Sequence, residues 1–569
     1  MSKNKDIQFV DASKEVEIHL PDGRSLRAPR GAAIGDCLAL IQEADQPLIV
    51  GAIVNSALRE LTFPVDIESN VVPVATDTSD GTRIYRRSLT FLLEAAFAKT
   101  FKKAKLLVDH SVFSGGYFCH VEGRDPLTED ELVMLKARMQ EIIDADTPFE
   151  RTEVPIEEGI DFFTEHNMDD KVRLLKHRKK DYLVLYDLGG FRDYHHGYMV
   201  PSSGYLKLFD LVLAGGGFVL RFPRQSKPLE LSPVRTVPKL LETFRRYGDW
   251  LDLLGISSVG SLNDAIVSGR IREIVLMSEA LHEQRVASIA TEIANRDDVR
   301  IVLVAGPSSS GKTTFSKRLS VQLLAHGLYP FALELDKFFV DRTKTPKDED
   351  GEFDFEHIDA IDRERLNQDV VKLIAGEETQ LPHYNFLTGI SEEGEKVQLA
   401  SDQVIIIEGI HGLNPELLPS IPAEKTFRVY LSALTQLNLD RHNRVSTTDT
   451  RLIRRIVRDA RERGYSPSDT IQRWESVRRG ESNYIFPYQD NADVMFNSAL
   501  VYELAALKPL AEPLLRQVSF GKPEHIEVKR LLALLEWFLP LDHAIIPDNS
   551  LLMEFIGGSI LKDFSVWQQ

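Results

Sequence analysis

The sequence predicts an α/β unit with a parallel sheet over residues 299–516, preceded by a small β-rich unit and an α+β unit. A glycine-rich phosphate-binding motif directly follows an apolar strand at Ile301–Ala305. Four further apolar strand candidates, at 331–335, 404–407, 427–431 and 493–497, alternate with helical stretches, a pattern that indicates parallel pairing. Near the N-terminus, the alternating run VEIHL, a PDG turn and the run RSLRA predict a β-hairpin.

Length and composition indicate several globular units. The 569 residues correspond to about three or four domains, and an apolar content of 43% allows each to bury a core. The net charge of −18 argues against a general nucleic-acid coat protein but leaves room for a local basic site. Cys37 and Cys119 give neither a disulfide framework nor metal spacing. The run MSKNKDIQFV lacks a secretory apolar segment and no apolar run is long enough to span a membrane, so we expect a cytoplasmic protein without membrane contact.

The phosphate-binding motif, GPSSSGKT at residues 306–313, has the spacing G-x-x-x-x-G-K-S/T. Glycines at its ends let the backbone turn tightly and approach a phosphate. The amides between them meet the N-terminus of the next helix, so donors and helix dipole act on one anion. We expect Lys312 to reach the β- and γ-phosphates of ATP and the Thr313 hydroxyl to hold Mg²⁺. The predicted ATP-binding residues of this segment are Gly306, Ser308, Ser309, Ser310, Gly311, Lys312, Thr313 and Thr314.

Two carboxylates at the ends of predicted strands complete this candidate site. Asp336 ends FALELD, which places it at the edge where parallel sheets bind ligands. Glu408 ends VIIIEG, in the manner of an acid that holds Mg²⁺ directly or through water. The alternatives are a helix or turn cap for Asp336 and a structural buried pair for Glu408. We predict Thr313, Glu408 and Asp336 as the metal-binding residues.

An arginine-rich helix is predicted at TRLIRRIVRDARERG, residues 450–464. Four guanidinium groups share one face of this helix, those of Arg451, Arg454, Arg455 and Arg458. Like charges at these offsets repel one another unless an anion lies among them, and a triphosphate satisfies them bidentately. We therefore predict a lid that closes on phosphates, against the alternative of a solvated face paired with acidic neighbours.

Ordered motifs over residues 300–515 make this region similar to the uridine/cytidine kinase branch of the phosphoribulokinase/uridine kinase family. The motifs are GPSSSGKTT, LDKFF, FEHIDAID, LPHYNF, IIIEGI and RRIVRDARERG. The resemblance implies an ATP- and Mg²⁺-dependent nucleoside kinase in which Asp336 is the candidate base for the 5′-hydroxyl of the substrate. It implies catalytic roles for Lys312, Arg458 and Arg463, phosphate binding by Arg455, and substrate binding by Glu356, Tyr384, Phe386 and Arg458.

Three departures from the family pattern alter the expected substrate site. Glu356 replaces the family's ribose-binding Asp, the base-reading His is missing around Gly389, and Tyr465 replaces an Arg after the lid. Uridine or cytidine is therefore an expectation from the family. A kinase of another small hydroxyl substrate, such as a sugar phosphate or a pantothenate-like acceptor, and a tRNA-responsive nucleotide-binding regulator both stay open.

The N-terminal part resembles two modules of threonyl-tRNA synthetases. LPDGRSL, the helix start at 31–38 and VGAIVNSALREL are similar to a TGS domain, a ubiquitin-like β-grasp module. IYRRSLTFLLEAAF, HSVFSGGYFCHVEG, LTEDELVMLKARMQEII and FRDYHHGYMVP are similar to the editing-type domain that follows it. That family's cluster of three His and one Cys falls at Arg87, Phe91, His195 and Met199. The resemblance implies that the editing chemistry is lost and that tRNA binding, oligomerisation or regulation is the surviving role.

Three further segments carry weaker expectations. The basic run KVRLLKHRKKD, residues 171–181, is expected to be a solvated face, with tRNA phosphate contact as the alternative. His195 and His196 are expected to be ordinary polar loop residues, with a metal site as the alternative. The segment IPDNSLLMEFIGGS at 546–559 packs on the kinase core or makes an oligomer contact, and we expect a homo-oligomer. The predicted units are 1–78, 79–228, a helical connector 229–298, 299–516 and a helical tail 517–569.

Overall fold

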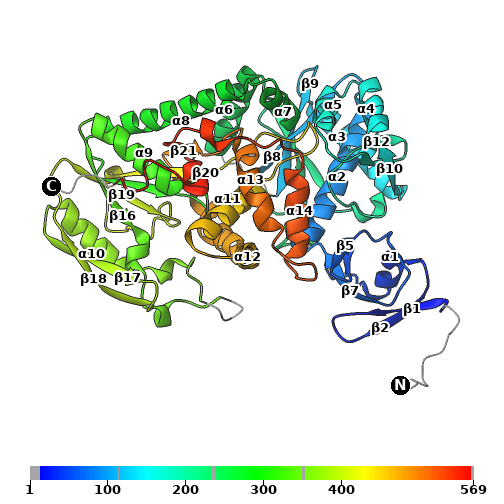
Figure 1. Ribbon diagram of the computed structural model, residues 1–569, viewed down its shortest axis with the longest axis horizontal. Coiled ribbons are helices and arrows are strands. Elements are labelled where there is room, and N and C mark those ends of the chain that lie inside the picture. The colour runs from blue at the N-terminus through cyan, green and yellow to red at the C-terminus, as the bar shows by residue number, and fades with distance from the viewer. Residues whose placement is uncertain (1–12, 113–114, 234–237, 349–350, 352, 565–569) are drawn as a thin grey trace, which may run out of the picture.

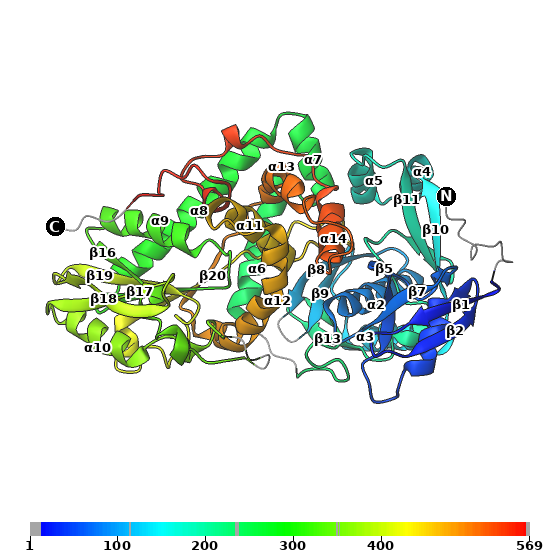
Figure 2. The same ribbon diagram turned by 60° about the horizontal axis from the view of Figure 1, so that its bottom comes forward.

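The computed structural model describes residues 13–112, 115–233, 238–348, 351 and 353–564 (Figure 1). The N-terminal stretch that was considered for a secretory signal, residues 1–10, therefore lies outside the described residues. The small N-terminal unit lies at one end of the long axis and the parallel sheet at the other, with α12, α13 and α14 between them (Figures 1 and 2). Among the described residues, none of the helices combines the length and apolar character that a membrane span requires.

The N-terminal unit is a mixed five-stranded sheet with one short helix, as predicted. Its strand order is β2-β1-β7-β4-β5. β1 and β2 form the antiparallel hairpin at the PDG turn, and β1 pairs in parallel with β7. Ile34 and Leu38 of the helix share a core with Ile18 and Val54 of the sheet. The elements are β1 (Glu15–His19), β2 (Ser25–Pro29), β3 (Ala32–Ala33), α1 (Ile34–Leu38), β4 (Ile49–Val54), β5 (Ala57–Arg59), β6 (Pro64–Val65) and β7 (Ser69–Ala75).

The second part is an α+β unit organised around the long helix α2 (Ser79–Thr100). The Thr78 hydroxyl caps this helix by accepting a hydrogen bond from the amide of Gly81. Leu89 and Leu92 lie in the apolar cluster that this helix shares with a four-stranded antiparallel sheet, β13-β14-β9-β8, while Phe91 contacts the three-stranded sheet β10-β11-β12. The other elements are β8 (Lys105–Val112), β9 (Gly116–Glu122), α3 (Glu129–Asp144), β10 (Phe149–Pro155), α4 (Ile156–Glu165), α5 (Asp169–Lys176), β11 (Tyr182–Leu188), β12 (Phe191–Asp193), β13 (Asp210–Ala214) and β14 (Gly217–Arg221).

The basic run at 171–181 is only partly the solvated face that the sequence suggested: Arg173, Lys176 and Lys179 are exposed, whereas Lys171 is buried. Lys171 lies on α5 and is only 1% exposed, with its ammonium 3.1 Å from both Asp193 and Asp440. Arg178 stacks on the ring of Trp537 at 4.3 Å, and Lys180 pairs with Glu536 at 2.8 Å. The run therefore contacts the other half of the same chain, because carboxylates of distant segments neutralise the charges of Lys171 and Lys180.

The C-terminal half is built on a five-stranded sheet in which all neighbouring strands are parallel. The order β16-β19-β15-β20-β21 puts the strand before the phosphate-binding motif at the centre. The strands are β15 (Ile301–Ala305), β16 (Tyr329–Glu334), β19 (Gln403–Gly409), β20 (Thr426–Ser432) and β21 (Val494–Asn497), close to the predicted ones. The helices and the added hairpin are α9 (Lys312–Ala325), α10 (Arg363–Ile374), α11 (Thr447–Glu462), α12 (Pro467–Tyr484), α13 (Glu503–Leu515), β17 (Thr379–Asn385) and β18 (Ile390–Val397).

Residues 238–294 form three helices that pack into the core of the parallel sheet. Val286 and Ile289 of α8 share one apolar cluster with Phe315 and Leu319 of α9. The predicted connector is thus part of the layer that covers the phosphate-binding helix. The remaining helices are α6 (Pro238–Leu254), α7 (Val259–Val267), α8 (Ile271–Ala294), α14 (His525–Leu535) and α15 (Met553–Ile556). The predicted unit boundaries stay predictions, and each falls between two of these elements.

Candidate active site

The phosphate-binding loop connects β15 to α9 at the carboxyl edge of the sheet. A Cβ on Gly306 would lie 1.9 Å from the carbonyl oxygen of Leu431, so only glycine allows β20 this close. Gly311 has a φ of +91°, a conformation that glycine adopts without strain. The Lys312 ammonium donates to the carbonyl oxygens of Gly306 at 3.0 Å and Pro307 at 3.1 Å. The lysine therefore folds back over the loop, in position to contact a bound phosphate.

Two of the three predicted metal-binding side chains, those of Thr313 and Glu408, meet at the start of α9. The Thr313 hydroxyl donates to Glu408 Oε1 at 2.8 Å. Burial raises the pKa of Glu408 to about 7, the charges of Glu554 and Asp336 add to that rise, and Lys312 opposes it. One hydroxyl and two carboxylates that repel one another form an oxygen-only donor set, which fits Mg²⁺.

Asp336 does not end the strand as predicted. β16 stops at Glu334, and Asp336 lies in the 3₁₀ turn Leu335–Phe338 that follows. The Asp336 side chain has solvent-exposed surface, but protein atoms surround most of it. This partial burial and the charge of Glu334 raise the pKa of Asp336. Lys312 and Arg463 lower the same pKa, which places both cations near this carboxylate. Asp336 thus lies near Lys312 of the loop, in the turn that follows β16.

Three of the predicted lid arginines converge on one buried carboxylate. Asp459, which is 1% exposed, lies 3.2 Å from Arg455, 2.9 Å from Arg458 and 3.7 Å from Arg463. Arg455 also donates to the Ser308 hydroxyl at 2.8 Å. The cluster therefore presents cations to the loop from a fixed anchor on α11.

The other two arginines of that helix face are buried and paired with carboxylates. Arg451 pairs with Glu481 of α12 and donates to the carbonyl oxygen of Ser308 at 2.9 Å. Arg454 is fully buried and pairs with Glu503 of α13 at 2.5 Å. The predicted face of four phosphate-binding arginines is thus divided into two functions. Its inner half packs against the loop and against two helices whose carboxylates neutralise it.

An aromatic cluster, formed by Phe339, Tyr384 and Phe386, lies where the substrate residues were predicted. The buried ring of Tyr384 meets Phe339 at 5.5 Å and Phe386 at 5.0 Å, both edge to face. The Tyr384 hydroxyl is buried without a hydrogen-bond partner, so a polar ligand group can satisfy it. Gly389, where the base-reading His is missing, packs against the guanidinium of Arg342, which donates to the carbonyl oxygen of Phe386 at 2.7 Å.

Glu356 belongs to the same site. Burial and Glu481 raise the pKa of Glu356 to about 7, while Arg455 and Lys312 lower it. A Cβ on Gly480 would lie 2.6 Å from the Glu356 Cβ, so α12 needs glycine to admit this side chain. Glu356, one methylene longer than the family's Asp, thus lies close to Arg455 of α11 and Lys312 of the loop.

Sequence reasoning missed several residues that the fold brings to the loop. Glu481 accepts from the amide of Ser308 at 3.0 Å. Both ring nitrogens of His411 are buried without partners, two residues beyond the strand that carries Glu408. The position of His411 just after IIIEGI was a usable signal, whereas Glu481 lies on a separate helix and gave none.

The C-terminal segment packs directly on the phosphate-binding loop, which resolves the alternatives left open for it in favour of the kinase core. A Cβ on Gly311 would lie 2.2 Å from Leu551 Cδ2. Glu554 Oε2 accepts from the amide of Thr314 at 3.2 Å, in the first turn of α9. Lys317 donates to the carbonyl oxygens of Leu561 at 2.8 Å and Lys562 at 2.7 Å. The carboxylate of Glu554 thus already accepts a hydrogen bond from the Thr314 amide, which was predicted to bind a phosphate.

Glu554→Gln is expected to lower the Michaelis constant for ATP about two- to fivefold, because it removes a competing charge from the helix N-terminus. Steady-state kinetics against ATP concentration measure this change. Asp548→Asn, an exposed change in the same segment, is the matched control and should leave the constant unaltered. An unchanged or raised Michaelis constant in Glu554→Gln would show that Glu554 does not compete with the nucleotide.

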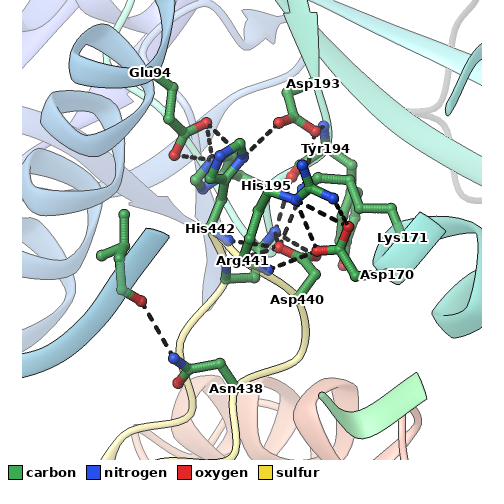
Figure 3. A network of polar contacts seen from close by, with 12 residues as sticks. Glu94, Asp170, Lys171, Asp193, Tyr194, His195, Asn438, Asp440, Arg441 and His442 are labelled. Atoms are coloured by element: carbon green, nitrogen blue, oxygen red, sulfur yellow. Dashed lines mark hydrogen bonds and ion pairs between the residues drawn. The ribbon is translucent and has the colours of Figure 1, made fainter. Parts of the chain in front are cut away.

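The editing-type positions form a different network, in which His195 lies against Glu94 (Figure 3). Phe91 stacks edge to face on His195 at 5.4 Å, and Met199 accepts from the Ser88 hydroxyl at 3.6 Å. His195 Nε2 lies 3.0 Å from both carboxylate oxygens of Glu94. The backbone amide of His196 donates instead to Oδ1 of Asn443 at 3.2 Å.

The network joins α2 and β12 to residues 438–443 of the kinase half (Figure 3). His442 Nδ1 lies 2.9 Å from Asp193, and ligand atoms of Glu94, Asp193 and His442 all lie within 4.8 Å of one another. Burial raises the pKa of Glu94 to about 8. Because the Lys171 ammonium already neutralises Asp193, this cluster is an interdomain polar contact rather than the metal site that His195 and His196 suggested.

The central loop, the parallel sheet and the strand-end acids define the C-terminal part as a P-loop kinase fold. Residues 301–505 match the model of the Phosphoribulokinase / Uridine kinase family, which confirms that resemblance. The N-terminal half matches threonine–tRNA ligases. The enzyme of Lawsonia intracellularis (strain PHE/MN1-00) is 29% identical over 179 residues, which cover 31% of this chain and 28% of that protein.

A second ligase and one solved structure are also similar to parts of this chain. The threonine–tRNA ligase of Clostridium kluyveri (strain ATCC 8527) is 27% identical over 260 residues, which cover 43% of this chain and 40% of that protein. The chain thus spans well under half the length of these ligases. The solved structure of a possible uridine kinase from Bacillus stearothermophilus is 20% identical, with a TM-score of 0.24, and covers 35% of this chain and 89% of that chain.

Proposed function

We propose that the chain is an ATP- and Mg²⁺-dependent nucleoside kinase that transfers the γ-phosphoryl group of ATP to a 5′-hydroxyl. The observation that carries this proposal is the proximity of Lys312, Glu408 and Asp336 at one sheet edge. The family match supports phosphoryl transfer, and the aromatic cluster of Phe339, Tyr384 and Phe386 supports a planar acceptor.

Each group has a role that follows from its position. The loop amides and Lys312 hold the ATP phosphates, and Thr313 and Glu408 would hold Mg²⁺, which shields the charge of the transferred group. Asp336 orients the acceptor hydroxyl and takes its proton. Arg458 and Arg463 stabilise charge on the transferred group, because a loose transition state is stabilised chiefly by positioning and charge.

The acceptor base is proposed to stack against the aromatic cluster of Phe339, Tyr384 and Phe386, and Glu356 is proposed to bind the ribose hydroxyls. Stacking accepts any nucleobase, whereas polar contacts discriminate strongly between bases. Because Arg342 covers Gly389, where the family reads the pyrimidine edge, uridine and cytidine are the leading candidates by family alone.

The test is a panel assay of ADP release with each nucleoside, with sugar phosphates, with pantothenate and with tRNA. We expect ATP turnover that depends on a nucleoside and requires Mg²⁺. Turnover that depends only on a sugar phosphate or on pantothenate would replace the acceptor while keeping the kinase. A tRNA effect on ATP binding without any acceptor would overturn the proposal in favour of a regulator.

A further inference from the structure

A cavity of about 240 Å³ lies where α2 of the N-terminal half meets α11, α12 and α14 of the kinase half. Among the described residues that line it, six are arginines and one, Asp449, is a carboxylate. The arginines are Arg83, Arg86, Arg87, Arg444, Arg478 and Arg530. Three come from α2 and three from the kinase half, so the cavity is a junction of the two halves.

Half of these guanidinium groups have a carboxylate partner. Arg530 binds Asp449 through two hydrogen bonds of 2.7 Å. Arg83 lies 2.9 Å from Asp80 and 3.1 Å from Glu527, and Arg478 lies 3.5 Å from Glu475. These three are therefore neutralised within the described part of the chain.

The other three arginines have no carboxylate partner among the described residues. Arg86 Nε is buried without any hydrogen-bond partner, and its guanidinium lies over the ring of Phe222 at 4.7 Å. Arg87 donates to the carbonyl oxygen of Tyr198 at 2.7 Å. Arg444 donates to the Asp109 carbonyl oxygen and the Ser111 hydroxyl, both at 2.8 Å. Arg87 and Arg444 lie within electrostatic range of the Glu60 and Asp109 carboxylates, whereas the charges around the buried Arg86 are mainly those of other arginines. Because a buried charge without a counter-charge is costly, an anion beside Arg86 would be favoured.

The electrostatics of the surrounding groups agree with a positive potential. The pKa of Arg86 falls to about 10, first through burial and then through neighbouring cations that include Arg478 and Arg83. The pKa of His196, which also lines the cavity, falls to about 3 through burial and four nearby cations, Arg87, Arg530, Arg178 and Lys180. The histidine therefore stays neutral at pH 7 and leaves the positive charge to the arginines.

The cavity also adjoins the N-terminus of α11, a helix of 16 residues. Ser446, which caps the helix, and Thr448 of its first turn both line the cavity. Hydroxyl donors, a helix N-terminus and planar guanidinium groups are the combination that binds tetrahedral oxyanions. We propose that this cavity is a binding site for a small phosphate-bearing anion, separate from the ATP site.

The enclosure favours a small ligand over a nucleic acid. A space of about 240 Å³ bounded by four helices and a loop holds one or two phosphate groups, and the net charge of −18 opposes a polyanion at long range. A ligand here would contact α2 and α11 together. Since α11 carries Arg451, Arg454 and Arg455 to the phosphate-binding loop, binding would link the two halves of the chain.

The experiment uses the full chain carrying Lys312→Ala, which disables the ATP site. Calorimetry and thermal unfolding with inorganic phosphate, pyrophosphate and a nucleoside monophosphate separate the ligand sources. We expect one molecule of at least one of these anions to bind. Adding Arg86→Gln should weaken that binding at least tenfold, and it should raise Tm without ligand because an uncompensated charge is removed. Arg245→Gln, an exposed arginine paired with Glu242, is the matched control and should change neither property.

Arg444→Gln, on the opposite wall, gives the same test if Arg86→Gln fails to fold. The proposal is overturned if none of the three anions binds at millimolar concentration, or if both cavity variants bind as tightly as their parent. It is also overturned if an RNA oligonucleotide binds this site more tightly than every small anion.

Discussion

Lys312→Ala is expected to reduce nucleoside-dependent ADP release by at least about a hundredfold while the chain remains folded. Among the described residues, the Lys312 ammonium lies over the loop and donates to two carbonyl oxygens, so its charge is available to the transferred phosphate. Its loss removes charge stabilisation where negative charge develops. A coupled ADP assay measures the rate, and circular dichroism measures folding.

Asp336→Asn tests the acceptor side of the same reaction and should cause a loss of similar size, because an amide cannot accept the hydroxyl proton. The matched control is Lys396→Ala, an exposed residue paired with Glu378 on the β17–β18 hairpin. Nucleoside-dependent turnover within about tenfold of the parent rate in either Lys312→Ala or Asp336→Asn would refute the corresponding role.

The sheet and the loop could be predicted because their signals are local. Runs such as IVLVA and VIIIEG are apolar throughout, as expected of strands that are buried on both faces, and glycine spacing specifies the loop. The strand after α9 extends over 329–334, not 331–335, because Tyr329 and Pro330 pair with β19. The chain bends at Leu335, which moved Asp336 into a turn without removing it from the sheet edge.

The partners of charged side chains could not be predicted, since they come from distant segments. The sequence around Arg454 does not indicate that Glu503 is its partner, and the sequence around Thr314 does not indicate that Glu554 contacts its amide. Lys171 illustrates the same limit, because its charge within a basic run looked solvated until Asp193 and Asp440 enclosed it. Helical periodicity identifies a face of a helix, but tertiary contacts decide whether that face meets solvent, ligand or protein.

Arg454→Met is expected to destabilise the chain by about 3–5 kcal/mol, because it leaves the buried Glu503 carboxylate without its cation. Arg454 is the largest fully buried side chain among the described residues. It lies 2.5 Å from Glu503 and donates to the carbonyl oxygen of Ser498 at 2.8 Å. Urea unfolding followed by fluorescence measures the change, with Arg473→Met on the exposed face of α12 as the control, expected within about 0.5 kcal/mol of the parent.

The double variant Arg454→Met/Glu503→Gln distinguishes the pair from its surroundings. Removing both charges should recover most of the lost stability, since a neutral amide still accepts the Leu500 amide at this position. ADP release should stay below the parent rate, because Arg454 also approaches the loop carbonyl oxygens of Ser309 at 3.4 Å and Ser310 at 3.5 Å. Full recovery of both properties would mean that Arg454 serves only the core. No recovery of stability would mean that its packing, rather than its charge, maintains the fold around the loop.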